Sequence, residues 1–293
     1  RESAVYRVAG VLSVIGGWFI TAFIAFSVSA IFALILFKTG KTGTYILVST
    51  VLGYIILSQI QFSKKDKKEK KSKDRLRIFD NQDLSTIQKY KYLIRINISE
   101  IATSYNLIIN GLMHNDMAKL EKAYFILKEL EVHSLEVRTK SIKYLKSLQT
   151  NDSQTAEVIV FSSDFIQDLS HSTTSLSNEV YFYVKNLHEI SDKKFLKDLA
   201  ALDEKMTHFF NVILDSLEQA ETEDFENIRA ERNKVRAFIN NKLEYQIRNI
   251  NIQKPSTKEG VLQTNVFLQS RDIQAVLTRI SKMFLKLYEK SSN

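Results

Sequence analysis

The sequence KKDKKEKKSK, residues 64–73, separates two parts of the chain that differ in character. Residues 8–62 before it are almost entirely apolar, whereas residues 78–293 after it are rich in polar and charged side chains. Between residues 64 and 77 there are nine basic residues and three acidic ones, so this short run holds +6 of the formal charge of +8. We therefore expect three regions, at residues 1–63, 64–77 and 78–293.

The concentration of basic charge in one run argues against nucleic acid as a partner. Nucleic-acid binding needs basic residues spread over a folded surface. A lysine run beside an apolar segment is instead attracted to anionic lipid, and it marks the side of the membrane that is not translocated. We therefore expect residues 64–293 to be cytoplasmic. The lysines expected to face lipid are Lys64, Lys65, Lys67, Lys68, Lys70, Lys71 and Lys73.

Two segments of the apolar region have the length of membrane spans. Trp18 to Phe37 is a run of 20 uncharged residues, which a helix rising 1.5 Å per residue needs to cross about 30 Å of hydrocarbon. After a linker at residues 38–43, Thr44 to Phe62 is the second expected span. Residues 8–17 either extend the first span into a long tilted helix or form a half-helix broken at the pair Gly16-Gly17.

Small side chains recur every four residues along the first expected span. Such a ridge lets helix backbones approach closely, as they do in multi-helix membrane bundles. A two-span anchor surrounded by lipid does not need one, so we expect the ridge to pack against further transmembrane helices of a longer protein, of which this chain is a fragment. The ridge consists of Gly17, Thr21, Ala25, Ser29 and Ala33.

Residues 78–293 are expected to be all-α, with six long helices. Only Gly111, Pro255 and Gly260 interrupt the pattern, and the predicted N-caps are Asp116, Ser153, Asp192 and Asp224. One buried apolar stripe per helix is predicted, for example Leu120, Leu127, Leu130, Leu135, Ile142 and Leu145. The predicted helices run at about Leu84 to Met113, Asp116 to Leu148, Ser153 to Ile190, Asp192 to Glu221, Asp224 to Ile252 and Lys258 to Lys290.

An internal repeat divides these helices into two units of three. The sequence YNLIINGL at residues 105–112 aligns with FNVILDSL at residues 210–217. In the next helix an offset of 108 residues pairs Leu120 with Ile228 and Leu127 with Val235. Repeats of this kind indicate duplicated supersecondary units. The third helices of the two units do not align convincingly by sequence.

The sequence contains no pattern of catalytic residues. It has no cysteine and only five histidines, which form no metal-binding pair, and it lacks phosphate-loop, GxSxG and dinucleotide-binding motifs. The acidic turn at residues 218–226 is interpreted as a solvated loop in which Asp224 caps a helix. The polar patch at residues 168–172 is interpreted as an exposed or interhelical face. We expect no enzyme activity, no cofactor and no metal site.

Residues 7–22, RVAGVLSVIGGWFITA, resemble the last transmembrane region of bacterial inorganic phosphate transporters of the PiT family, in the subgroup with a C-terminal PhoU-like domain. Residues 78–293 are similar to that domain in their repeats and in the stretch from Phe165 to Leu176. The family's Gly-Ala-Asn-Asp signature is not in this chain, so substrate-binding residues are expected in a missing N-terminal part. Where metal-binding PhoU proteins carry acidic residues, this chain has Ser170 and Thr174.

The resemblance implies the C-terminal part of an inner-membrane phosphate permease, with two transmembrane helices followed by a PhoU-like pair of three-helix bundles that regulates transport. Its implied partners are inorganic phosphate, a coupling cation, anionic lipid and the remaining transmembrane helices. Whether the protein is a homo-oligomer is left open. The alternative is a two-span membrane-anchored signalling or scaffold protein whose helical bundle binds a protein partner.

Overall fold

The computed structural model describes residues 18–34, single residues between 37 and 49, and residues 77–291 apart from 82, 148–152, 220–223 and 250–256. The chain divides into two compact units, Arg1–Lys73 and Asp74–Asn293. All regular structure in the described residues is helical, as the all-α prediction requires. The expectations for residues 8–17 and for the seven lysines lie outside the described residues, as does most of the second expected span.

The first unit contains a helix at residues 18–34. Its large apolar side chains are exposed on every side, from Phe19 at 75% to Phe32 at 42%. Within the part of the chain that is described, no helix combines the length and the apolar character needed to cross a membrane.

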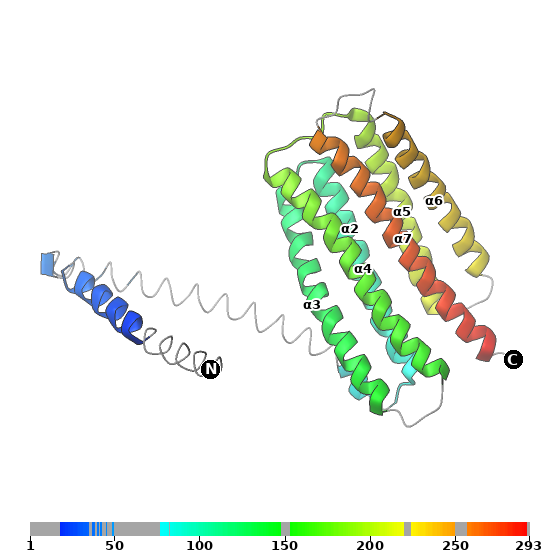
Figure 1. Cartoon of the computed structure of the whole chain (residues 1–293), viewed down its shortest axis with the longest axis horizontal. Helices are drawn as coiled ribbons and strands as arrows, with labels where there is room; N and C mark the ends of the chain where they lie inside the picture. Colours follow the sequence, from blue (N-terminus) through cyan, green and yellow to red (C-terminus); the bar gives the residue numbers. More distant parts are fainter. Residues whose placement is uncertain are drawn as a thin grey trace, which may run out of the picture. The chain divides into compact units, whose positions relative to one another are not determined.

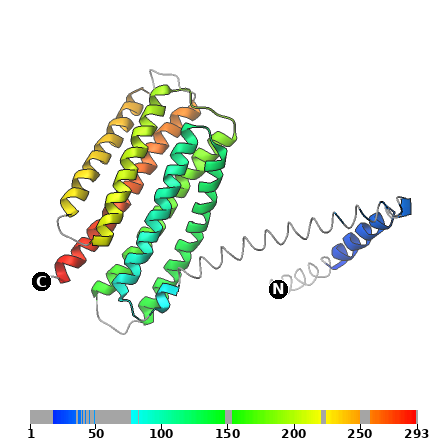
Figure 2. The same cartoon turned by 180° about the vertical axis from the view of Figure 1, so that it is seen from behind.

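The second unit is a bundle of six long helices, which confirms the predicted number (Figure 1). A short 3₁₀ helix, η1, precedes them. Successive long helices run antiparallel, and α3 and α6 lie at opposite edges of the bundle in both views (Figures 1 and 2). The elements are η1 (Arg77–Asp80), α2 (Thr86–Met113), α3 (Met117–Ser147), α4 (Ser153–Lys185), α5 (Lys193–Gln219), α6 (Asp224–Asn249) and α7 (Thr257–Ser291).

Local side-chain contacts explain several helix boundaries. Ser85 and Gln88 form a capping box at the start of α2, in which each side chain binds the other residue's backbone N–H. Asp116 and Asp192 are caps as predicted, since their carboxylates accept hydrogen bonds from the backbone N–H groups of Lys119 and Lys194. Helix α4 ends at Lys185, before the predicted Ile190, because Leu187 adopts a left-handed conformation with φ of 59°.

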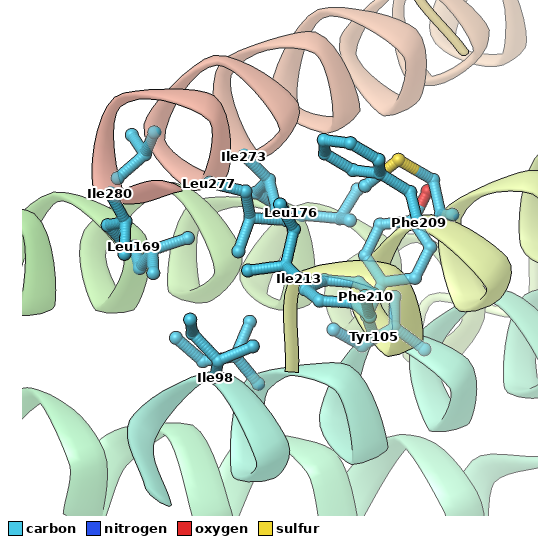
Figure 3. Packing of buried hydrophobic residues seen from close by; sticks show 14 of the residues in the cluster. Ile98, Tyr105, Leu169, Leu176, Phe209, Phe210, Ile213, Ile273, Leu277 and Ile280 are labelled. Carbon is cyan, nitrogen blue, oxygen red and sulfur yellow. The ribbon is translucent and has the colours of Figure 1, made fainter. Parts of the chain in front are cut away.

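One hydrophobic core runs through both three-helix units. Helix α2 packs against α5, and α4 packs against α7. Figure 3 shows side chains of these four helices meeting at the centre, among them Tyr105, Leu176, Phe210 and Ile273. The rings of Tyr105 and Phe210, which occupy equivalent positions in the two repeats, lie 5.8 Å apart.

The pattern of buried positions extends the repeat to the third helices, α4 and α7, which do not align by sequence. Adding 104 to the residue number places twelve of the fourteen buried positions of α4 on buried positions of α7. Leu169 then corresponds to Ile273, Leu176 to Ile280, and Val180 to Phe284. Several buried α4 residues are serines or threonines, whereas their α7 counterparts are mostly apolar, so the sequence similarity is lost although the packing is kept.

The prediction of a single buried stripe was wrong for α3. Leu120, Leu127 and Leu130 are buried, but Leu135 and Ile142 are about half exposed, at 51% and 49%. Helix α3 is an edge helix that packs mainly against α2 and α4, with a smaller contact between Tyr144 and Phe79 of η1. Its apolar residues therefore form two stripes, of which one faces the core and the other faces away from it.

Candidate functional groove between α4 and α7

A groove of about 1060 Å³ lies between the N-terminal half of α4 and the C-terminal half of α7. These are the third helices of the two units, and they lie side by side (Figure 1). Helix α3 contributes one side chain, Arg138, to the rim. The lining residues used below are Val158, Phe161, Asp164, Phe165, Gln167, Asp168, His171, Arg279, Lys282, Met283, Lys286 and Leu287.

The floor of the groove is apolar. Phe161 and Phe165 lie one helical turn apart on α4, with their rings stacked at 6.1 Å between centroids. Phe165 is buried beside Met283 and Leu287, whereas Phe161 is 43% exposed. A half-exposed aromatic ring in a groove is a typical anchor for an apolar part of a ligand or partner.

Paired charges hold the rims in place. The Nη1 of Arg138 donates to Gln167 Oε1 at 2.6 Å, and its Nε lies 3.9 Å from Asp164. Across the groove, the Nη2 of Arg279 donates to Asp168 at 3.1 Å, joining α7 to α4. The guanidinium of Arg279 also lies 5.4 Å from the centroid of the Phe165 ring, within cation–π range.

Lys282 and Lys286 differ from these arginines. They lie one turn apart on α7, both are exposed, and neither makes an ion pair among the described side chains. The groove therefore offers an apolar floor and two cations that are not engaged by neighbouring carboxylates. This arrangement suits an amphipathic ligand or peptide with an acidic edge.

The predicted polar patch at residues 168–172 is divided by the structure. Asp168 and His171 line the groove, whereas Leu169 and Ser170 are fully buried in the core. The hydroxyl of Ser170 donates to the carbonyl of Ile166 in its own helix, and Thr174 Oγ1 is buried without a hydrogen-bond partner. No group of three or more His, Asp or Glu side chains that could hold a metal occurs in the described residues.

Two half-buried carboxylates join the repeats away from the groove. Asp203 of α5 accepts hydrogen bonds from the side-chain amides of Asn106 and Asn110 of α2, at 3.0 and 3.1 Å. Glu179 of α4 accepts one from Asn265 of α7 at 2.8 Å. Burial raises the pKa of both carboxyl groups, and the amide hydrogen bonds oppose the rise only in part.

The other predicted residues are placed as follows. Thr21, Ala25, Ser29 and Ala33 all lie exposed on the helix at residues 18–34, whereas Gly17 is outside the described residues. In the acidic turn, Glu218 pairs with Arg95 of α2, and Glu226 lies 3.8 Å from Arg229.

The sequence analysis singled out the patch that contains Asp168 and His171, but it did not connect this patch with the other groove residues. Arg138, Asp168 and Arg279 come from three helices, and Arg279 lies more than 100 residues from the other two, so no local motif unites them. One usable signal was Phe161, an aromatic residue that lies one turn before Phe165 and outside the buried stripe of α4.

Comparison with known proteins gives no relative on which a function can be based. Neither the protein-family models nor the curated proteins include a significant match to this chain.

Proposed function

We propose that the chain is the C-terminal part of a bacterial inorganic phosphate permease, a secondary transporter of the inner membrane, with residues 78–293 as its cytoplasmic PhoU-like regulatory domain. Residues 1–63 then supply the last two spans, and Lys64 to Lys73 lie against anionic lipid. The observation that carries the proposal is the combination of an apolar helix bearing a row of small residues with a bundle built from two similar three-helix units.

The helix at residues 18–34 supports the membrane part. It is apolar on all sides, and such a helix is stable only when lipid or other protein surrounds it. The small residues Thr21, Ala25, Ser29 and Ala33 are exposed along it, and such a row of small side chains suits close packing against further transmembrane helices.

The groove supports a regulatory role for the bundle. A ligand or partner bound between α4 and α7 contacts both three-helix units at once, and it can therefore favour one packing of the two units over another.

The alternative is a two-span anchored scaffold protein, and the same groove favours it, since a partner helix could dock there. The two proposals differ in whether the protein moves phosphate. Cells that lack their own phosphate uptake should regain uptake of labelled phosphate when they express the full-length protein. Correctly inserted protein without uptake would overturn the permease proposal in favour of the scaffold.

The regulatory part has its own test. Deleting residues 78–293 should leave uptake in place but remove its adjustment to phosphate supply. Lys282→Glu with Lys286→Glu should have the same effect if the groove binds the regulator. The matched control is Lys193→Glu with Lys197→Glu, an exposed pair one turn apart on α5 and away from the groove, which should behave like the unaltered protein.

A further inference from the structure

The outer stripe of α3 is an exposed apolar surface with a regular spacing. Phe125, Val132, Leu135 and Ile142 are each 49–57% exposed, although this helix also buries a full core face. Their spacings of seven, three and seven residues are those of the a and d positions of a coiled coil. With Phe125 and Val132 at a, the remaining a and d positions are Thr139 and Lys128.

The position of α3 leaves this stripe accessible. Helix α3 runs along the edge of the bundle opposite to α6 (Figures 1 and 2). Its buried residues, including Leu127, Leu130 and Val137, occupy the other side of the helix. The stripe therefore lies where a second helix could pack without any change in the bundle.

The stripe is complementary to itself in one orientation. If two α3 helices lie antiparallel about a point between residues 133 and 134, Phe125 of one copy meets Ile142 of the other. The same register pairs Val132 with Leu135 and Lys128 with Thr139, so every a position meets a d position. A surface that matches itself about a two-fold axis is what an isologous dimer requires.

On one side of the stripe, the charged residues of the two copies are of opposite sign in this register. Glu131 of each copy lies beside Arg138 of the other, so by symmetry each arginine, whose guanidinium already contacts Gln167 and Asp164 of its own copy, gains a second acidic neighbour. On the other flank Glu129 lies beside Glu136 of the second copy. This like-charge pair is solvent-exposed, where such contacts are weak, and it offers a test because replacing one glutamate creates an attraction.

We propose that α3 forms the interface of an antiparallel dimer of this chain, with the Phe125–Ile142 stripe as its core. The proposal does not depend on phosphate transport, since it uses only the surface of the bundle. It names the second copy as occupant because the pairing of all six a and d positions follows from the sequence of α3 alone.

The chain has no cysteine, so engineered cysteines would be its only thiols. Phe125→Cys and Ile142→Cys versions of the full chain, carrying different tags and expressed together in membranes, should form a disulfide-linked pair of unlike tags on oxidation. Phe125→Cys alone should not cross-link, because two Phe125 positions lie 17 residues apart along the helices, or about 25 Å. Cross-linking of Phe125→Cys alone, or none in the mixture, would overturn the antiparallel register.

Charge variants give an independent readout. Leu135→Glu places a carboxylate in the central layer and should weaken dimerisation by about tenfold or more, as measured by sedimentation of the purified full chain. Glu129→Lys faces Glu136 of the second copy and should instead tighten the dimer. Glu204→Lys, an exposed change on α5, is the control. A monomer in every case, with unchanged helix content, would refute the dimer.

Discussion

Gly111 lies where the end of α2 passes closest to α3. A Cβ atom at this position would lie 2.5 Å from Leu120 Cδ2 and 3.3 Å from the carbonyl of Asp116. Gly111→Ala should therefore lower the free energy of unfolding by about 1–3 kcal/mol, the usual cost of overpacking. In a Leu120→Ala background the clash is removed, and the same change should be neutral or favourable by up to about 1 kcal/mol from helix propensity.

Urea unfolding of the four proteins in this cycle measures the coupling between Gly111 and Leu120. If Gly111→Ala costs the same in both backgrounds, the backbone contact with Asp116, and not the Leu120 side chain, is what requires glycine.

Asp203 predicts a pH dependence of stability. Its pKa is raised by burial, so the folded protein holds this proton more tightly than the unfolded chain. The ionised carboxylate therefore reduces stability at neutral pH, and this penalty disappears as the pH falls through the raised pKa towards the ordinary value of about 4. Asp203→Asn removes the charge while keeping an oxygen that can accept from Asn106 and Asn110.

The stability advantage of Asp203→Asn over the unaltered protein should therefore shrink as the pH is lowered from 7 towards the ordinary carboxyl pKa of about 4. Measuring both proteins by urea unfolding at each pH cancels the contribution of the other titrating groups. A difference that does not change with pH would show that Asp203 has no raised pKa in the folded state.

At the scale of elements, Glu259 connects the first turn of α7 to the segment between α4 and α5. Its buried carboxylate accepts hydrogen bonds from the Ser191 backbone N–H at 3.0 Å, the Ser191 hydroxyl at 2.6 Å and the Asp192 backbone N–H at 3.1 Å. Glu259→Gln exchanges an acceptor oxygen for a donor amide of similar size. It should lower the free energy of unfolding by about 1–3 kcal/mol, whereas exposed Glu204→Gln should change it little.

Hydrogen exchange locates the effect of this change. Amides at the start of α5 should lose protection in Glu259→Gln before those in the middle of α2, because Ser191 and Asp192 precede α5 directly. Uniform loss of protection across the bundle would show that Glu259 contributes to global stability only.

The sequence predicted helices well because their boundaries depend on local chemistry, such as the caps at Asp116 and Asp192. It predicted α3 less well because periodicity does not say which apolar stripe meets the core. Leu135 and Ile142 have the spacing of buried residues, yet the neighbours of α3 lie on its other side. The groove was not predicted for a related reason, since Arg138, Asp168 and Arg279 are brought together only by the packing of three helices.

The ridge of small residues is tested by a matched pair of serines on the helix at residues 18–34. Ser29→Leu adds bulk to the ridge and should impair assembly with further transmembrane helices, which lowers phosphate uptake by the full-length protein at equal insertion. Ser27→Leu makes the same change on the opposite side of the helix, where uptake should be retained. Equal uptake by the two variants would remove the ridge as support for the transporter proposal.

At the scale of the whole molecule, the two units of the bundle share one core. The hydroxyl groups of Tyr105 in the first three-helix unit and Ser270 in the second three-helix unit are hydrogen-bonded at 2.7 Å. The ring of Tyr105 also packs against Phe210. Among the described residues, the buried core residues lie between Tyr90 and Leu287 and the partly buried ones packed against them begin at Ile78, so a fragment of residues 74–293 keeps these contacts. The sequence repeat alone would equally allow two domains that fold independently.

The shared core predicts that residues 74–293 unfold in one cooperative transition. The free energy of unfolding measured by circular dichroism in urea should equal the opening free energy measured by hydrogen exchange of central amides in α2 and in α5. Residues 74–190 alone should not form a stable fold, because removing α5 and α7 exposes buried side chains such as Tyr105 and Leu176. If that half unfolds at the same urea concentration as the whole bundle, the two units are independent domains, and binding in the groove could not couple them through the core.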